Sequence, residues 1–244
     1  TGVLTHEIVL NHLISIDHPE KSERIIELIK LLKKKKLDFL IREINPITKE
    51  KKWVKTIHSN FHIKSLKSKY PIGEKSSLIA VKGCLQGIDE IMKNRHKNIF
   101  CAVRPPGHHA LNTGKHEGFC FYNHIAISAK YIQSKYKLRK VLIIDWDYHH
   151  GNSTELFFYN DPSVLFFSTH DANAYPRTGS PDRIGSGKGR GYNVNIHLPC
   201  GTTDKKIIST YENILVNKAN IFKPDFILIS AGFDSRKNDP LGCF

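Results

Sequence analysis

Several features that mark other classes of protein are scarce in this sequence. Its 244 residues include only five cysteines, an odd number, and no two of them form a C-x-x-C pair. No apolar stretch approaches the roughly 20 residues that span a bilayer, and the first residues carry no signal-peptide pattern. These absences argue against a disulfide scaffold, a cysteine-based zinc site and a membrane protein. They predict free thiols in a reducing, intracellular compartment.

Acidic residues are also in short supply. Asp and Glu total 23 against 37 Lys and Arg, which gives a formal net charge of +14. Such a charge favours nucleic acid or anionic membranes in some proteins. The run Lys33–Lys36, however, has no interleaved aromatic residues and ends a predicted helix, where cations suit the helix dipole. We therefore interpret the excess as a solvated lysine-rich surface and expect no direct binding of nucleic acid or membrane.

Hydrophobic residues make up 40% of the chain and charged residues 25%, a globular composition. Helical periodicity alternates with short apolar runs along the chain. The expected helices cover residues 19–36, 76–92, 121–136, 152–159 and 204–221. The expected strands cover residues 99–103, 141–144, 164–167, 192–196 and 226–229. This alternation predicts an α/β fold, a single domain over residues 1–244 with a mostly parallel sheet flanked by helices.

Polar residues follow three of the expected strands. They are His108 and His109 after the first, Asp145, Asp147 and His149 after the second, and Asp234 after the last. Ligands of open α/β sheets bind beyond the carboxyl ends of the strands. We therefore expect all three strand ends to deliver these residues to one edge of the sheet.

Asp147 and His149 are two residues apart, so an extended segment presents both on one face. Together with Asp234 they make three nitrogen and oxygen ligands, and three protein ligands with an open position are the catalytic zinc arrangement. Ligand softness alone also allows Mn²⁺, Fe²⁺ or Co²⁺. The alternative interpretation is a strand end whose polar groups are hydrogen-bonded without a metal.

The pair His108-His109 follows a Pro-Pro-Gly turn and is a candidate general acid and base, because imidazole titrates near neutral pH. The alternative is a structural histidine pair. Asp145 is placed to hold one imidazole in a fixed tautomer, as carboxylates do in hydrolytic sites. Gly118-Phe119 and Tyr175 are candidates for the walls of a narrow apolar slot, although aromatic residues more often belong to the core.

These residues lie in strings that resemble the histone deacetylase family, in particular its class II branch and the related bacterial acetylpolyamine amidohydrolases. The strings follow the family order over essentially the whole chain. They are His18-Pro-Glu with Arg24-Ile25, Arg104-Pro-Pro-Gly-His-His-Ala110, Gly118-Phe-Cys-Phe-Tyr-Asn123, Val141-Leu-Ile-Ile-Asp-Trp-Asp-Tyr-His-His-Gly-Asn152, Asp161-Pro-Ser-Val164, Phe167-Ser-Thr-His170, Ser230-Ala-Gly-Phe-Asp234 and Asp239-Pro-Leu-Gly242.

The resemblance implies a zinc-dependent deacetylase with an arginase-like α/β fold that acts on N-ε-acetyl-lysine in histones or other proteins. It assigns Zn²⁺ to Asp147, His149 and Asp234. It makes His108 and His109 the general acid and base, with Asp145 behind His108 and Asn152 behind His109. It also implies that the Gly118 carbonyl receives the substrate amide, and that Phe119 and Tyr175 form the tunnel walls.

The resemblance further implies two structural K⁺ sites. One falls on Asp145, Asp147, His149, Ser168 and Thr169, mainly through backbone oxygens. The second uses backbone oxygens of Phe158, Asp161, Val164 and Tyr192. Protein partners of the corepressor type and a location in the nucleus or cytoplasm are also implied. The first residue, Thr1, is not Met, so an organelle stays open.

The chain departs from the family pattern where it stops, at Phe244. The family continues into a segment with a Gly-Gly-Tyr (or His) motif, so we expect a C-terminally truncated domain. Loss of one oxyanion donor typically lowers the rate by about 10²–10³-fold. Two alternatives therefore stay open: a deacetylase of acetylpolyamines or other small acetylated amines, which the glycine-rich stretch 183–191 favours, and a catalytically impaired acetyl-lysine-binding scaffold. An arginase-type site is disfavoured, because Trp146 and Tyr148 supply no ligands for a second metal.

Overall fold

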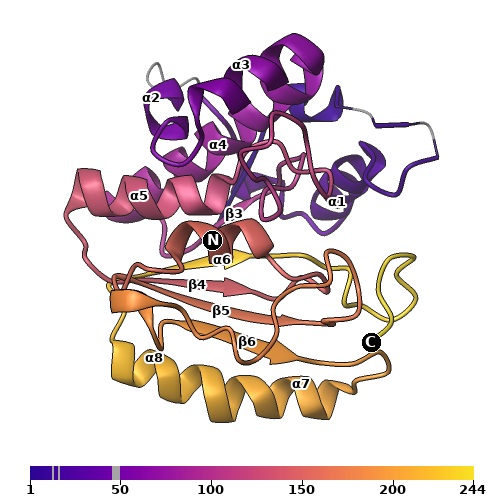
Figure 1. Cartoon of the computed structure of the whole chain (residues 1–244). Coiled ribbons are helices and arrows are strands. Elements are labelled where there is room, and N and C mark those ends of the chain that lie inside the picture. The colour runs from indigo at the N-terminus through magenta and orange to yellow at the C-terminus, as the bar shows by residue number, and fades with distance from the viewer. Residues whose placement is uncertain (13, 16, 46–49) are drawn as a thin grey trace. The chain divides into compact units, whose positions relative to one another are not determined.

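The computed structural model describes residues 1–12, 14–15, 17–45 and 50–244, which form two compact units, Thr1–Tyr131 and Ile132–Phe244 (Figure 1). Each unit contains a parallel sheet with helices, so the α/β expectation is confirmed. The expectation of one domain over the whole chain stays a prediction. Within the described ranges, no helix has the length and apolar character needed to cross a membrane.

The first unit is built around a three-stranded parallel sheet of order β2-β1-β3. Its strands are β1 (Gly2–Thr5), β2 (Ile41–Glu43) and β3 (Ile99–Cys101). Its helices are α1 (Glu23–Lys34), α2 (Glu50–Val54), α3 (Asn60–Lys69) and α4 (Pro71–Met92), with short 3-10 helices η1 (Glu7–Leu10) and η2 (Asp38–Leu40). Helix α5 (His124–Tyr136) contains the residues where the first unit ends and the second begins.

The core of the first unit joins its sheet to α4. Leu4, Val9, Ile44 and Ile79 are buried together. Helix α4 begins at Pro71, where the missing N–H costs nothing because the first turn of a helix has no partner for it. Its Gly87 lets the helix approach β3 closely, because a Cβ there would come within 2.8 Å of a side-chain carbon of Ile99.

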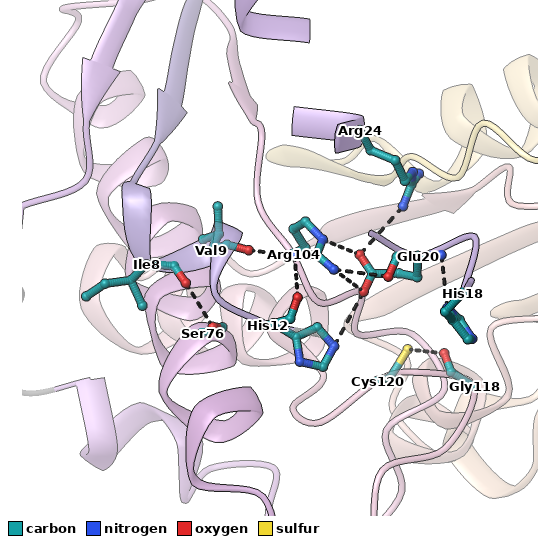
Figure 2. Close-up of polar contacts among 10 residues, drawn as sticks. All are labelled: Ile8, Val9, His12, His18, Glu20, Arg24, Ser76, Arg104, Gly118 and Cys120. Atoms are coloured by element: carbon teal, nitrogen blue, oxygen red, sulfur yellow. Dashed lines mark hydrogen bonds and ion pairs between the residues drawn. The ribbon is translucent and has the colours of Figure 1, made fainter. Parts of the chain in front are cut away.

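A buried ion pair ties two distant segments of the first unit together (Figure 2). Arg104, 1% exposed, donates to both carboxylate oxygens of Glu20, from Nε at 2.6 Å and from Nη2 at 2.8 Å. Its Nη1 donates to the backbone carbonyls of Val9 and His12, at 2.9 and 2.8 Å. The loop that starts at Arg104 is thus anchored to the segment that precedes α1.

The second unit is built around a four-stranded parallel sheet of order β6-β5-β4-β7. Its strands are β4 (Val141–Asp145), β5 (Val164–His170), β6 (Asn193–His197) and β7 (Phe226–Ser230). Its helices are α6 (Asn152–Phe158), α7 (Asp204–Thr210) and α8 (Val216–Phe222), with a π-helical turn η4 (Tyr211–Leu215) between the last two and a 3-10 helix η3 (Gly187–Gly189). Figure 1 shows α7 and α8 running along this sheet, and Leu215 and Phe222 are buried against Leu142 and Phe167 of β4 and β5.

The position of β3 corrects one expectation. β3 pairs with β1 in the sheet of the first unit, whereas β4 and β7 are neighbours in the sheet of the second. The prediction that three strand ends share an edge of one sheet therefore holds for β4 and β7 and is wrong for β3. The reason is that β1, a strand of four residues, carries no recognisable pattern of its own, so the sequence does not reveal the partner of β3.

The cysteines correct a second expectation. Cys200 and Cys243 form a disulfide with Cα atoms 5.0 Å apart, whereas Cys84, Cys101 and Cys120 keep their thiols. The two segments meet because the chain returns beside the end of β6, where the Gly201 N–H donates to the Cys243 carbonyl at 2.7 Å. The prediction that all five thiols are free is thus wrong, and a reducing compartment stays a prediction that the cysteines no longer support.

Candidate metal centre

Three potential metal ligands meet at the carboxyl ends of β4 and β7. The two strands pair in register as far as Asp145 beside Ser230, so the segments that follow leave the same edge of the sheet. Ligand atoms of Asp147, His149 and Asp234 all lie within 4.8 Å of one another. Their side chains are only 17%, 16% and 15% exposed. The predicted grouping of these three residues is therefore present in the second unit.

The imidazole of His149 lies between the two carboxylates. Its Nδ1 is 3.1 Å from Asp147 Oδ1 and 2.7 Å from Asp234 Oδ2. Burial lowers the pKa of His149, but hydrogen bonds to Asp147 and Asp234 outweigh burial and raise that pKa to about 10. Burial and the charge of Asp147 raise the pKa of Asp234. The positive charge of protonated His149 therefore lies between the carboxylates of Asp147 and Asp234.

Backbone amides hold the two carboxylates in place. The His149 N–H donates to Asp147 Oδ1 at 2.8 Å, and the Tyr148 N–H donates to Asp234 Oδ1 at 2.9 Å. The Asp147 N–H donates to Asp145 Oδ1 at 3.2 Å, and Asp145 itself is fully buried. Because each acid is fixed through its backbone neighbours, the ligand oxygens are pre-positioned rather than free to rotate.

A glycine makes room for one of the acids. A Cβ at Gly232 would lie 2.0 Å from Asp147 Oδ2 and 2.4 Å from its Cγ, a distance that no side chain tolerates. Gly232 belongs to the Ser-Ala-Gly-Phe-Asp string after β7. The sequence predicted a metal ligand, Asp234, in this string. It did not reveal that Gly232 leaves room for the side chain of Asp147, which follows β4.

The remaining predicted site residues are divided between the units. His108 and His109 are buried in the first unit, with ring centroids 4.0 Å apart. Phe119 is in the same unit, where its ring and that of His18 are nearly perpendicular with centroids 4.3 Å apart. The Gly118 carbonyl accepts a hydrogen bond from Cys120 Sγ at 3.2 Å (Figure 2). Tyr175 is in the second unit and is 49% exposed.

The residues predicted for the first K⁺ site lie on adjacent strands of the second unit. Asp145 and Ser168 are paired across β4 and β5, and both are fully buried. Thr169, the next residue of β5, shares a hydrogen bond of 2.9 Å with the Tyr211 hydroxyl. In the predicted second site, the carbonyls of Phe158 and Asp161 accept backbone hydrogen bonds from the N–H groups of Asp161 and Val164, at 3.0 and 3.3 Å.

Sequence reasoning missed a network of polar residues that includes His150, the neighbour of the ligand His149; His150 and Glu155 are buried, and Thr178 and Arg183 are exposed. His150, Glu155, Thr178 and Arg183 are connected by hydrogen bonds and ion pairs within the second unit. The signal available was slight: His150 stands in the Asp-Tyr-His-His-Gly string, but its partners are separated from it by loops and turns.

Comparison with known proteins adds an independent line of evidence. The sequence matches the family described as "Histone deacetylase domain" over residues 18–244. A protein named "Probable deacetylase" from Archaeoglobus fulgidus is 36% identical over an alignment of 256 residues, which covers 99% of this chain and 71% of that protein. "Histone deacetylase 15" from Arabidopsis thaliana is 43% identical over 173 residues, which covers 69% of this chain and 31% of that protein. "Histone deacetylase 14, chloroplastic" from the same plant is 41% identical over 170 residues, covering 68% and 40%.

A solved structure shares the fold. The structure described as "Crystal Structure of HDA15 HD domain" is similar with a TM-score of 0.91 and 33% sequence identity, over 100% of this chain and 77% of that one. This chain spans less than half of the length of each of the two plant proteins. The match of the family description covers all the predicted site residues named above.

Proposed function

This chain belongs to the histone deacetylase family, and from that premise we propose that it is a zinc-dependent amidohydrolase that removes acetyl groups from N-ε-acetyl-lysine in histones or other proteins. The relatives named above support the deacetylase reaction itself. The observation that carries the proposal of zinc is the grouping of Asp147, His149 and Asp234 within 4.8 Å.

The chemistry of the three donors fits a zinc ion. Two carboxylates and one imidazole supply the nitrogen and oxygen ligands that zinc accepts, and three protein ligands leave one position open, as in catalytic sites. His149 Nδ1 lies between the two carboxylates, where a doubly charged cation would be attracted more strongly than a single proton. Asp147, His149 and Asp234 would therefore hold the ion, with His149 binding through Nδ1.

Zinc, when bound, would polarise the acetyl carbonyl and would lower the pKa of the attacking water to about 7. The chain's own residues would move the protons. We assign His108 and His109 to accept a proton from the attacking water and to donate one to the leaving amine. Their rings are 4.0 Å apart, and two adjacent imidazoles resist being charged together, so one acid and one base are the favoured state.

Two further residues would distinguish these histidines. We assign Asp145 as the partner of His108 and Asn152 as the acceptor behind His109. A carboxylate stabilises an imidazolium, whereas an amide does so weakly. His108 is therefore better suited to be protonated and act as the general acid, and His109 is better suited to be neutral and act as the general base. The Gly118 carbonyl is the proposed acceptor for the substrate amide, with Phe119 and Tyr175 as walls around the acetyl-lysine side chain.

We also propose K⁺ at the two sites implied by the family. The backbone and hydroxyl oxygens of Ser168 and Thr169, with Asp145, suit a hard cation better than zinc. Replacing K⁺ by tetramethylammonium, which is too large for such a site, is expected to lower stability without removing zinc. Thermal unfolding in the two salts checks this.

The substrate class is tested by comparing turnover of an acetyl-lysine peptide with that of acetylated polyamines by the complete zinc-loaded protein. We expect kcat/KM to be at least about tenfold higher for the peptide, a difference of about 1.4 kcal/mol in transition-state binding. The reverse preference would assign the enzyme to small acetylated amines. The glycine-rich stretch 183–191 is the feature that keeps this second candidate. No hydrolysis of either would contradict the proposed reaction.

The charge on His149 gives a prediction for the metal-free protein. Since its pKa is raised to about 10, His149 is expected to keep its proton throughout the neutral range. The raised value exceeds the unfolded value of about 6.5, so this proton stabilises the metal-free fold fully below about pH 6.5 and its contribution is lost as the pH rises through 10.

Zinc binds only neutral imidazole, so adding zinc at pH 8 is expected to remove the His149 proton. Imidazole NMR spectra of the metal-free protein between pH 6 and 11, repeated after addition of zinc, check both statements. A His149 that titrates near its ordinary value, or one that keeps its proton with zinc bound, would contradict them.

A further inference from the structure

The segment between β5 and β6 is a long loop held by buried side chains rather than by regular structure. Apart from the 3-10 helix η3, it contains no helix or strand between His170 and Asn193, a range the structure describes throughout. It carries Tyr175, the proposed wall of the substrate tunnel. The contacts that hold this loop in place therefore also determine the position of Tyr175.

Two imidazoles anchor the loop just after Tyr175. His150, 1% exposed, shares a hydrogen bond of 2.7 Å between its Nδ1 and Thr178 Oγ1. His170, fully buried, hydrogen-bonds the Gly179 carbonyl through Nε2 at 2.9 Å. The planes of the two rings are inclined by 45°, and the ring centroids are 4.5 Å apart. Consecutive loop residues are thus tied to neighbouring rings.

The proton positions on both rings follow from their partners. A carbonyl only accepts, so His170 carries its proton on Nε2 and accepts from the Ser168 hydroxyl through Nδ1 at 2.8 Å. His150 Nε2 makes no hydrogen bond among the described residues, but it lies 3.4 Å from the carboxylate of Glu155. That charge favours a proton on Nε2, which leaves Nδ1 of His150 to accept from the Thr178 hydroxyl.

Glu155 binds a later part of the same loop, at Arg183. Its carboxylate, 3% exposed, accepts from Arg183 Nε at 2.6 Å and from the side-chain amides of Asn193 and Asn195 at 2.8 and 2.6 Å. Burial raises the pKa of Glu155, but the contact with His150 and the hydrogen bonds from the two amides outweigh burial and lower that pKa to about 2. The carboxylate is thus ionised, and it fixes both Arg183 and the orientation of His150.

The loop backbone lies against the two rings with no spare room. Gly179 has a φ of +82°, and a Cβ there would come within 2.3 Å of His170 and 2.6 Å of His150. Only three residues separate this contact from Tyr175, and the Arg177 N–H closes a turn onto the Ala174 carbonyl at 2.7 Å. A displacement of the backbone at Thr178 is therefore expected to displace Tyr175 as well.

We propose that His150 and Thr178 form a positioning pair that sets the loop carrying Tyr175 and couples it to the metal centre, because His150 directly follows the ligand His149. This inference rests on the proposed function, in which Tyr175 lines the substrate tunnel. His150 and Thr178 are neither proposed metal ligands nor proposed walls of the substrate tunnel. They act through the loop.

The test compares Thr178→Val, which keeps the shape but removes the hydroxyl, with Thr178→Ser, which keeps the hydroxyl. Thr178 is exposed, so either residue fits. In the zinc-loaded complete protein, Thr178→Val is expected to raise KM for an acetyl-lysine peptide about tenfold, the loss typical of one hydrogen bond that orders a loop. The expected change in kcat is less than about twofold, because a tunnel wall binds substrate and transition state alike. Zinc content should not change, and Thr178→Ser should restore the wild-type KM.

Amide hydrogen exchange gives a readout independent of activity. Peptides covering residues 174–180 are expected to exchange faster in Thr178→Val than in wild type or Thr178→Ser. Equal exchange in all three proteins, or a KM that does not respond to the loss of the hydroxyl, would overturn the proposal. If the wild-type protein hydrolyses no acetylated substrate, the proposed function fails, and the exchange comparison alone decides the positioning pair.

Discussion

Replacing Asp147 by Asn is expected to abolish deacetylation and to weaken zinc binding by more than the roughly 10–100-fold that loss of a supporting residue outside the ligands causes. The amide keeps the shape of the side chain but removes one of the two negative charges around His149. Without bound zinc the carbonyl is not polarised, so kcat/KM should fall by at least about 10³-fold, equivalent to about 4 kcal/mol. Zinc content by mass spectrometry and turnover of an acetyl-lysine peptide provide the measurements.

Asp204→Asn is the matched control, because it makes the same chemical change at an exposed carboxylate in the first turn of α7. It should leave zinc content and turnover at wild-type values. If Asp147→Asn retains zinc and activity like this control, Asp147 is not a ligand and the assignment of the metal centre is wrong.

Replacing Arg104 by Met is expected to lower the free energy of unfolding by about 3–5 kcal/mol, the typical cost of leaving one partner of a buried ion pair alone. The Glu20 side chain is 3% exposed and receives two short hydrogen bonds from Arg104 (Figure 2). Methionine fills a similar volume, so the loss reflects charge and hydrogen bonds rather than a cavity. Three backbone carbonyls, of Val9, His12 and Glu20, also lose this donor. Denaturant unfolding measures the difference.

Arg24→Met serves as the control for this prediction, because Arg24 contacts the same carboxylate. Its Nη1 lies 3.9 Å from Glu20 Oε1, but its side chain is 53% exposed. Exposed ion pairs contribute roughly 0–1 kcal/mol, so this variant should be nearly as stable as wild type. Equal losses in the two variants would show that burial does not decide the strength of the pair, and the anchoring role of Arg104 would be wrong.

Much of the sheet architecture is predictable because its signals are local. β4 and β5 are apolar runs that the structure buries completely, and the strands predicted at 141–144 and 164–167 are confirmed with slightly longer bounds. β1 and β2, of four and three residues, are too short to show a period, so they were not predicted. The helix predicted at 204–221 is interrupted by the π turn η4, where the hydrophobic period gives no warning.

The metal ligands are predictable for a similar reason. Asp147 and His149 follow one parallel strand and Asp234 follows its neighbour, and parallel strands bring their carboxyl ends together. Contacts that join distant segments left no such pattern. The pair Arg104–Glu20 spans 84 residues, and the contact of His150 with Thr178 spans 28. The disulfide of Cys200 and Cys243 spans 43 residues and contradicted the expectation drawn from cysteine spacing.

The most direct test of the central claim is an anomalous-scattering map at the zinc edge from crystals of the zinc-loaded protein. Our account predicts one strong peak about 2.0–2.2 Å from a carboxylate oxygen of Asp147, from Nδ1 of His149 and from a carboxylate oxygen of Asp234. A peak bound elsewhere, with His149 still hydrogen-bonded to both acids, would contradict it.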